Sequence, residues 1–302
     1  MRRHSPGEDS LKHLVWGITL TLALLSGAHA EDGVSAAASA QLPDPAPGPE
    51  AQAGAPGLKS AMALVLDQST RRVIYAKNAD AVAPIASITK LMTALVVVEA
   101  ELPLAETVAI TQEDVDEVKR TRSRLRVGTE LTRRDLLKLA LMASENRAAA
   151  ALTRAYPGGT RRFIAEMNQK AARLGMSRTR FVDGTGLSSE NVSTAPDLAR
   201  LVDAAHAHPL IRDFTTGAEH TVELRNGKTI RFGNSNGLVK NQGWQIGLSK
   251  TGYISEAGRC LVLQAHIAAK PVIIVLLDSW GKNTRIGDAN RIKKWMESNF
   301  LR

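Results

Sequence analysis

The chain has 302 residues, of which 44% are hydrophobic, and its 39 lysines and arginines against 30 acidic residues give a formal net charge of +9. A surplus of this size favours an anionic partner. The single cysteine, Cys260, excludes an intramolecular disulfide and a metal site built from several thiolates, and its apolar neighbours predict that it is buried.

The first 30 residues have the pattern of a cleaved secretory signal. Basic residues precede an apolar run at 14–27, and small residues follow it, with a cleavage site near Ala30. The apolar run is too short for a comfortable membrane span. We therefore predict that the mature protein is exported.

Residues 31–57 are rich in alanine, proline and glycine and have almost no large apolar side chain. This composition predicts a disordered leader, because such a segment cannot bury enough apolar surface to fold. Hydrophobic periodicity is then continuous over residues 58–302, without a second linker of this kind. The length of this part is within the range of one large domain.

Within that domain, the first predicted elements are two short strands at 61–67 and 72–78, which flank a turn and form a hairpin. Apolar residues then recur at three and four positions, which predicts helices. The predicted helices are 84–100, 132–156, 160–175 and 193–208. In the last of these, Thr194 is expected to cap the helix N-terminus.

After residue 208 the hydrophobic period changes to two, which predicts strands. A hairpin is expected at 220–234, because Asn226 and Gly227 form a strong turn signal. Three further strands are predicted at 244–253, 260–269 and 271–279, and an amphipathic helix at 290–301. Strands at both ends with helices between predict an α+β fold, in which both ends share one antiparallel sheet flanked by helices, with a helical subdomain inserted between them.

The helix predicted at 84–100 begins with Ser87-Ile-Thr-Lys90. Residues three apart share a helix face, so Lys90 is expected beside Ser87, where a buried amine of lowered pKa can accept the hydroxyl proton. Two simpler interpretations remain open on these residues alone. Ser87 can be a helix N-cap, and Lys90 can extend past apolar neighbours to water.

Two further motifs follow in chain order. In Ser144-Glu-Asn146, within the helical middle, Asn146 can accept a hydrogen bond from Lys90 while donating to a substrate amide, and Ser144 can relay a proton to a leaving amine.

The third motif, Lys250-Thr251-Gly252, is on a predicted strand of the late sheet. Here Lys250 supplies a positive field, Thr251 offers a hydroxyl to a substrate carboxylate, and Gly252 lets a ligand backbone approach the strand edge. Each motif alone is weak evidence, but their order and their placement on different elements favour a catalytic site.

With these motifs the chain resembles the serine D-alanyl-D-alanine peptidases, the low-molecular-weight penicillin-binding proteins. It looks most similar to the D-alanyl-D-alanine endopeptidase group, the penicillin-binding protein seven type. The resemblance begins near Leu58 and runs to the C-terminus. It includes "PIASITKLMTAL", "LSKTGYISEAGRC" and the segments 123–152 and 181–201.

This resemblance implies a β-lactamase/DD-peptidase-like fold and a periplasmic enzyme that hydrolyses D-alanyl cross-links in the peptide stems of peptidoglycan. It implies an acyl-enzyme on Ser87, Lys90 as the base and β-lactam antibiotics as covalent inhibitors. It also implies an oxyanion hole from the N–H groups of Ser87 and Tyr253, and a contact of Arg285 with the substrate carboxylate. No cofactor or metal is expected.

Two alternatives remain beside an endopeptidase. One is a D-alanyl-D-alanine carboxypeptidase that acts on uncross-linked pentapeptides, and the other is a non-catalytic protein that binds the cell wall. Efficient β-lactam hydrolysis is disfavoured. The second motif has Glu145 in place of the aspartate of the β-lactamase group. That group also uses a loop glutamate followed three residues later by an asparagine. Here Glu166 lies in a helical pattern instead, and Asn168 is only two residues away.

The remaining features concern partners. The basic segment Lys119–Arg126 is either a solvated connection or a contact with an acidic polymer, and the acidic residues 113, 114, 116 and 117 predict a solvated surface. His206 and His208 cannot share a helix face, so no zinc site is expected. Nucleic acid is not an expected partner. Many carboxypeptidases of the similar family continue into a β-rich domain that ends in a membrane-anchoring helix, whereas this sequence ends after one amphipathic helix. We therefore expect at most loose membrane association.

Overall fold

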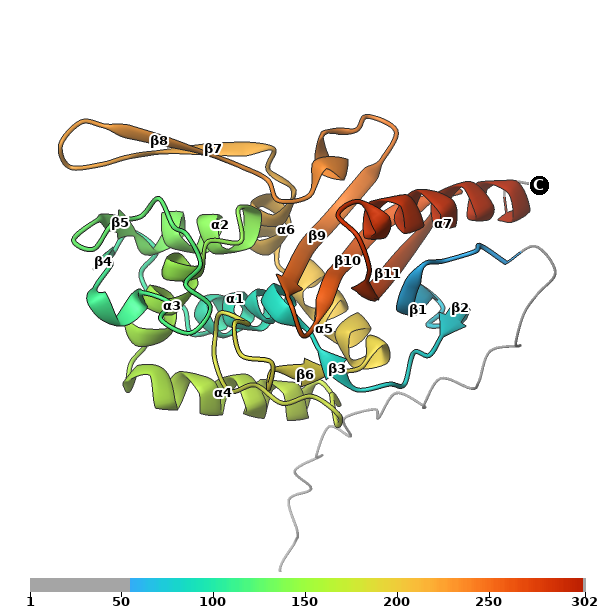
Figure 1. Ribbon diagram of the computed structural model, residues 1–302, viewed down its shortest axis with the longest axis horizontal. Helices are drawn as coiled ribbons and strands as arrows, with labels where there is room; N and C mark the ends of the chain where they lie inside the picture. Colours follow the sequence, from blue (N-terminus) through green and yellow to red (C-terminus); the bar gives the residue numbers. More distant parts are fainter. Residues whose placement is uncertain (1–54, 301–302) are drawn as a thin grey trace, which may run out of the picture. The chain divides into compact units, whose positions relative to one another are not determined.

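The computed structural model describes residues 55–300, and Figure 1 shows the arrangement of their helices and strands. The predicted signal peptide and residues 31–54 of the predicted leader lie outside the described residues, as do Leu301 and Arg302. Those two predictions therefore stay predictions.

A five-stranded antiparallel sheet joins the two ends of the described chain. Its strand order is β2-β1-β11-β10-β9. The strands are β1 (Ser60–Asp67), β2 (Val73–Lys77), β9 (Gln245–Ile254), β10 (Gly258–Ile267) and β11 (Lys270–Ser279). The pairing of β1 with β11 places Ser60 opposite Ser279. This sheet, with its helices, confirms the predicted α+β fold, and all five predicted strands are present.

Helices cover both faces of the sheet, so the inner strands read as almost continuous apolar runs. On one face, α7 (Thr284–Phe300) packs against β1, β10 and β11, with Ile292 and Met296 in an apolar cluster with Leu263 and Ile274. On the other, α5 (Ala195–Ala207) packs against the same three strands. The closing helix begins at Thr284, six residues before the predicted start at 290.

The helical part lies between β2 and β9 in the chain (Figure 1). Its helices are α1 (Lys90–Glu99), α2 (Arg133–Met142), α3 (Asn146–Arg154), α4 (Gly159–Arg173), α5 and α6 (Pro209–Thr216). Helix α4 agrees with the prediction for 160–175. In α5 the Thr194 hydroxyl accepts from the N–H of Asp197, which confirms the predicted cap.

Short strand pairs complete this part of the chain. They are β3 (Ala83–Pro84) with β6 (Val192–Ser193), β4 (Thr107–Ala109) with β5 (Glu130–Thr132), and β7 (Glu219–Glu223) with β8 (Thr229–Gly233). The last pair is the predicted hairpin. It includes a positive φ of 75° at Gly227, as the turn signal requires.

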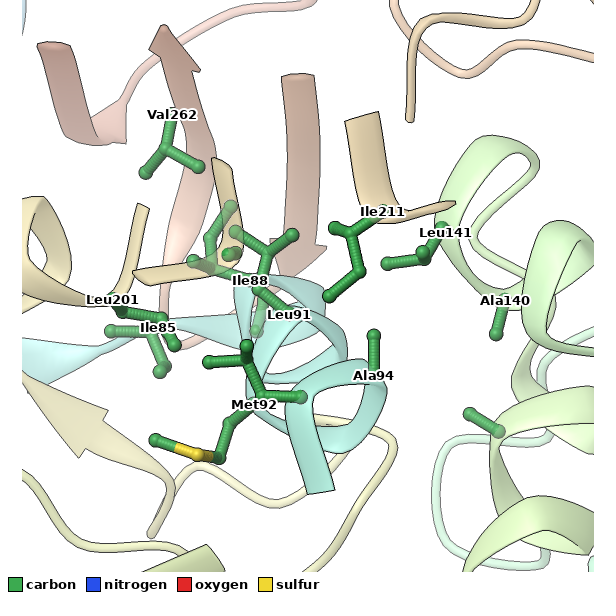
Figure 2. Close-up of a cluster of buried hydrophobic side chains, with 14 of the residues drawn as sticks. Ile85, Ile88, Leu91, Met92, Ala94, Ala140, Leu141, Leu201, Ile211 and Val262 are labelled. Atoms are coloured by element: carbon green, nitrogen blue, oxygen red, sulfur yellow. The ribbon is translucent and has the colours of Figure 1, made fainter. Parts of the chain in front are cut away.

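Helix α1 is surrounded by apolar side chains from several other elements. Figure 2 shows Leu91, Met92 and Ala94 of α1 among Ala140 and Leu141 of α2, Leu201 of α5, Ile211 of α6 and Val262 of β10. Close packing of this kind leaves the helix little freedom to shift. The residues at its N-terminus are therefore held in a fixed position relative to the sheet.

One predicted helix is divided in two in the structure, and one helix of the structure was not predicted. The predicted helix 132–156 is divided into α2 and α3, because Ser144 adopts a left-handed φ of 58° that an α-helix cannot accommodate. The helix predicted to end at 208 is followed directly by α6, which the prediction lacked and which begins with Pro209 at its first position. Cys260 is fully buried, as expected, and burial raises its pKa to about 11.

Within residues 55–300, no helix combines the length and apolar character needed to cross a membrane.

Candidate active site

Ser87 lies in a short 3₁₀ helix, η1 (Ala86–Thr89), directly before α1. It is only 9% exposed, and its neighbour Ala86 adopts a positive φ of 47°. Neither η1 nor α1 has a side-chain hydrogen bond at its N-cap, and Ser87 is the cap of neither helix. The N-cap interpretation of Ser87 is therefore wrong. A non-glycine residue in left-handed conformation next to Ser87 is a local strain that the surrounding packing maintains.

Lys90 is 1% exposed, so its amine does not reach water and the second simple interpretation is also wrong. Its Nζ lies 2.8 Å from Ser87 Oγ, 2.8 Å from Asn146 Oδ1 and 2.6 Å from the carbonyl oxygen of Thr185. Both of the latter oxygens can only accept. A neutral amine has two N–H groups and one lone pair, so with both N–H groups donated to these oxygens its lone pair faces the hydroxyl of Ser87.

Burial lowers the pKa of Lys90 to about 7, although the charges of Asp183 and Glu145 oppose the shift. Burial also lowers the pKa of Lys250 well below its usual value, and the positive charges of Lys90 and Arg285 lower it further. At pH 7 about half of the Lys90 amine is therefore in the neutral form that a proton acceptor requires.

Ser144 and Asn146 lie where the chain leaves α2 and enters α3. Asn146 accepts from Lys90 and donates through Nδ2 to Thr121 Oγ1 at 3.0 Å, which fixes its amide orientation. Ser144 Oγ instead accepts from Lys250 Nζ at 2.8 Å. The helix break at Ser144 therefore allows the two side chains of one motif to reach two different lysines.

Strand β9 carries the third motif along the edge of the sheet, against η1. Lys250 is 1% exposed, and Thr251 Oγ1 donates to Ser235 Oγ at 2.8 Å. A Cβ on Gly252 would lie 3.0 Å from the carbonyl oxygen of Ile85 and 3.1 Å from Ser87 N. The structural need for glycine thus comes from the backbone of η1, in addition to the ligand approach expected from the sequence.

Tyr253, the next residue on β9, is 56% exposed, and the guanidinium of Arg259 lies 4.4 Å from its ring centroid. Arg285, in the first turn of α7, is partly buried, and its Nε and Nη1 have no hydrogen-bond partner among residues 55–300. Burial and then the charge of Arg259 lower its pKa. Its effect on the pKa of Lys250 indicates that it acts electrostatically on this end of β9.

Sequence reasoning missed the loop that supports Lys90 from the opposite side. Asp183 accepts from the N–H groups of Thr185, Gly186 and Ser188, and this turn directs the Thr185 carbonyl to Lys90. The signal was present as Asp-Gly-Thr-Gly, in which an aspartate precedes residues that favour a tight turn.

The interpretation of residues 113–117 as a solvated acidic surface is wrong for two of the four acids. Asp114 is 3% exposed and pairs with Arg154, and it completes a capping box with Thr111 in η2 (Gln112–Asp114). Asp116 accepts from the N–H groups of residues 118, 119 and 121 and from Thr121 Oγ1. These acids organise an irregular segment that contacts Asn146.

Other polar residues that the sequence singled out are engaged elsewhere. Glu166 pairs with Arg162 on α4, and Asn168 binds the backbone of Phe181. In the described part of the chain, no group of three histidine, cysteine, aspartate or glutamate side chains could hold a metal ion. The arrangement around Ser87 provides a hydroxyl, a neutral amine and a second lysine, which are the groups needed for acyl transfer through a serine.

Comparison with known proteins agrees with this chemistry. Residues 50–281 match the D-alanyl-D-alanine carboxypeptidase family, Peptidase_S11. The chain is 49% identical over 254 residues to a D-alanyl-D-alanine endopeptidase of Pseudomonas aeruginosa, covering 83% of this chain and 82% of the relative. It is 47% identical over 247 residues to a D-alanyl-D-alanine endopeptidase of Escherichia coli, covering 82% and 80%.

Among solved structures, the Streptomyces K15 DD-transpeptidase superposes with a TM-score of 0.75 at 29% identity, over 80% of this chain and 98% of that one. The fold is therefore the serine β-lactamase/DD-peptidase type that the sequence motifs predict. The matched residues include all five strands of the sheet and all three motifs, and they end before α7. The chain belongs to the D-alanyl-D-alanine carboxypeptidase family and is a serine-type D-alanyl-D-alanine peptidase.

Proposed function

We propose that this protein is a periplasmic DD-endopeptidase that hydrolyses D-alanyl cross-links in peptidoglycan through an acyl-enzyme on Ser87. The observation that carries the proposal is the buried Lys90 amine, 2.8 Å from Ser87 Oγ, with two carbonyl oxygens to take its N–H groups. The names of the relatives from P. aeruginosa and E. coli support endopeptidase action.

In the proposed reaction, Ser87 Oγ attacks the carbonyl carbon of the D-alanyl residue, and its proton passes to Lys90. The tetrahedral intermediate then collapses, the C–N bond breaks, and the leaving amine takes a proton through Ser144. The N–H groups of Ser87 and Tyr253 stabilise the oxyanion, a contribution of about 10² to 10³ in turnover for one such donor. Water hydrolyses the resulting ester and frees Ser87.

The substrate carboxylate is proposed to lie at the end of β9, beside Lys250 and Thr251, where the positive charge of Arg285 also acts on Lys250. The same position accepts the carboxylate of a β-lactam, so we expect β-lactam antibiotics to acylate Ser87. The predicted signal segment supports a periplasmic location.

The test is to incubate the purified protein with a cross-linked muropeptide dimer and, separately, with a monomeric pentapeptide. We expect the dimer to be converted to monomers, as followed by chromatography and mass spectrometry. Release of D-alanine from the pentapeptide with the dimer left intact would instead establish a carboxypeptidase. Binding to cell-wall sacculi without either reaction, and without labelling by penicillin, would establish the non-catalytic alternative.

With Lys90 as the base, the rate of acylation should depend on pH. Only the neutral amine accepts a proton, so the second-order rate of labelling by a fluorescent penicillin should rise with pH and level off above the Lys90 pKa of about 7. Below that value, the rate should fall about tenfold per pH unit. A profile that is flat between pH 5 and 9 would contradict this role of Lys90.

The Asp183→Asn variant provides the comparison. The charge of Asp183 raises the pKa of Lys90, so removing it should move the midpoint of the profile to lower pH. The asparagine keeps one side-chain oxygen that can still accept from the N–H groups of Thr185 and Gly186, so the turn is preserved.

A further inference from the structure

The segment 116–126 is irregular, yet its side chains alternate between inward and outward positions. From 120 to 126 the residues at even positions are exposed, and those at odd positions are partly or fully buried. Each inward residue is anchored. Thr121 binds Asn146, Ser123 donates to the carboxylate of Glu145, and Leu125 is fully buried. The basic segment is therefore a built feature of the site rather than a loose connection.

The segment also contacts the sheet and the β7–β8 hairpin. Lys119 forms an ion pair with Glu256, in the turn between β9 and β10. Arg124 donates to the carbonyl oxygen of Arg231 at 2.6 Å, and its guanidinium lies 4.0 Å from the ring centroid of Phe232 in β8. In Figure 1 this hairpin extends over α2 and β5. Lys119 and Arg124 are thus engaged, out of the five basic residues in the segment. Their contacts place the segment where the helical part meets the end of β9.

Three arginines remain, Arg120, Arg122 and Arg126, and we call them the arginine ridge. All three are exposed, and none forms an ion pair with an acidic residue within residues 55–300. Two acids that precede the ridge in the chain are already occupied, Asp114 by Arg154 and Asp116 by the backbone of the segment itself. Three adjacent guanidinium groups without acidic partners repel one another, so an anionic ligand is favoured there.

The ridge is close to the reacting groups. Three hydrogen bonds lead from Ser87 Oγ through Lys90 and Asn146 to Thr121 Oγ1. Arg120 and Arg122 are the two neighbours of Thr121 in the chain, with Cα atoms about 3.8 Å away. The backbone that carries Arg120 and Arg122 therefore adjoins the hydrogen-bond network of Lys90 and Asn146.

We infer that the arginine ridge is a binding subsite for the free carboxylates of a second peptide strand in the cross-linked substrate. The inference rests on the proposed endopeptidase function, since only a cross-linked substrate has two strands at the site. Arginine is suited to this contact, because its planar guanidinium can bind a carboxylate with two parallel hydrogen bonds. Penicillin has no second strand and does not reach the ridge.

The test uses the triple variant Arg120→Gln, Arg122→Gln and Arg126→Gln. The matched control is Arg161→Gln, Arg173→Gln and Arg178→Gln, which removes three exposed arginines that form no ion pair within residues 55–300. Each triple is made in the active enzyme and in a Ser87→Ala background. The second-order rate of fluorescent-penicillin labelling is measured in the first, and the Kd for an intact muropeptide dimer in the second.

We expect the ridge variant to label with penicillin at a rate within about twofold of the parent, and to bind the dimer about tenfold more weakly, the typical combined effect of three exposed ion pairs. The difference should shrink at high salt, because screening weakens exposed charge pairs. A dimer with its carboxylates converted to amides should bind the parent and the ridge variant equally.

Unchanged dimer binding would overturn the inference. Equally weak dimer binding by the control variant would also overturn it, because this indicates a general effect of net charge. A tenfold loss of penicillin labelling in the ridge variant would overturn it too, because this indicates a distorted active site. Because binding is measured without turnover, the proposed function fails separately. If the protein with an intact Ser87 binds the dimer through the ridge but does not cut it, the proposed subsite stands and the proposed endopeptidase activity is refuted.

Discussion

Replacing Ser87 with alanine should abolish covalent labelling by a fluorescent penicillin and lower turnover of a D-alanyl peptide by about 10⁶-fold, the scale found when a serine nucleophile is removed. Alanine leaves no atom to form the ester, while the apolar contacts of η1 and α1 remain. Labelling is read on a gel, and the unfolding midpoint in urea serves to show that the variant is folded. Labelling that persists in Ser87→Ala would refute the assignment of the nucleophile.

Ser87 and Lys90 should behave as one unit, since each acts through the other. Lys90→Gln should therefore lose most of the activity, and the double variant should be about as inactive as Ser87→Ala alone. Lys77→Gln is the matched control. Lys77 also donates to two carbonyl oxygens, those of Leu58 and Ser60, but it is on β2, apart from the motif residues. It should label at the rate of the parent.

Replacing Gly186 with alanine should lower the free energy of unfolding by about 3 kcal/mol or more, because a left-handed backbone and a steric overlap combine. Gly186 has a φ of 77°, and an added Cβ would overlap the carbonyl group of Ala86 and lie 2.9 Å from Ser87 N. All of these atoms belong to the backbone, so no rotamer change relieves the overlap. The expected loss is measured by urea denaturation, and penicillin labelling of the folded fraction should slow as η1 shifts.

Gly227→Ala separates the two causes. Gly227 has a similar φ of 75°, but an added Cβ would meet nothing within 4 Å. Its cost should be the backbone strain alone, about 1 to 2 kcal/mol, with labelling unchanged. Equal losses in the two variants would show that the contact of Gly186 with η1 does not matter.

The strands could be predicted from the sequence because they are short apolar or alternating runs bounded by turn residues. That the first and last strands share one sheet was also predicted, but their order within it was not. The break at Ser144 could not be predicted in the same way. Residues 136–152 are rich in leucine and alanine, which favour a continuous helix, and the left-handed φ of Ser144 is stabilised by tertiary contacts such as its bond with Lys250.

The site shows the same division. Placement of Lys90 beside Ser87 follows from their spacing, and its hydrogen bond to Asn146 was expected from the motif, but the carbonyl of Thr185 was not. The roles of Asp114 and Asp116 were missed because a run of acidic residues usually indicates a solvated surface. Only the folded segment shows that Asp116 satisfies backbone N–H groups that no regular element pairs.

The pairing of β1 with β11 has a consequence for the timing of activity. A chain is synthesised from its N-terminus, so Ser87 and Lys90 are made well before Lys250 and the strands that complete the sheet. Because β1 has only β2 as a partner until β11 arrives, this long-range pairing forms late. The site around Ser87 therefore gains Lys250, and with it the complete set of catalytic groups, only after the last strands of the sheet have been made.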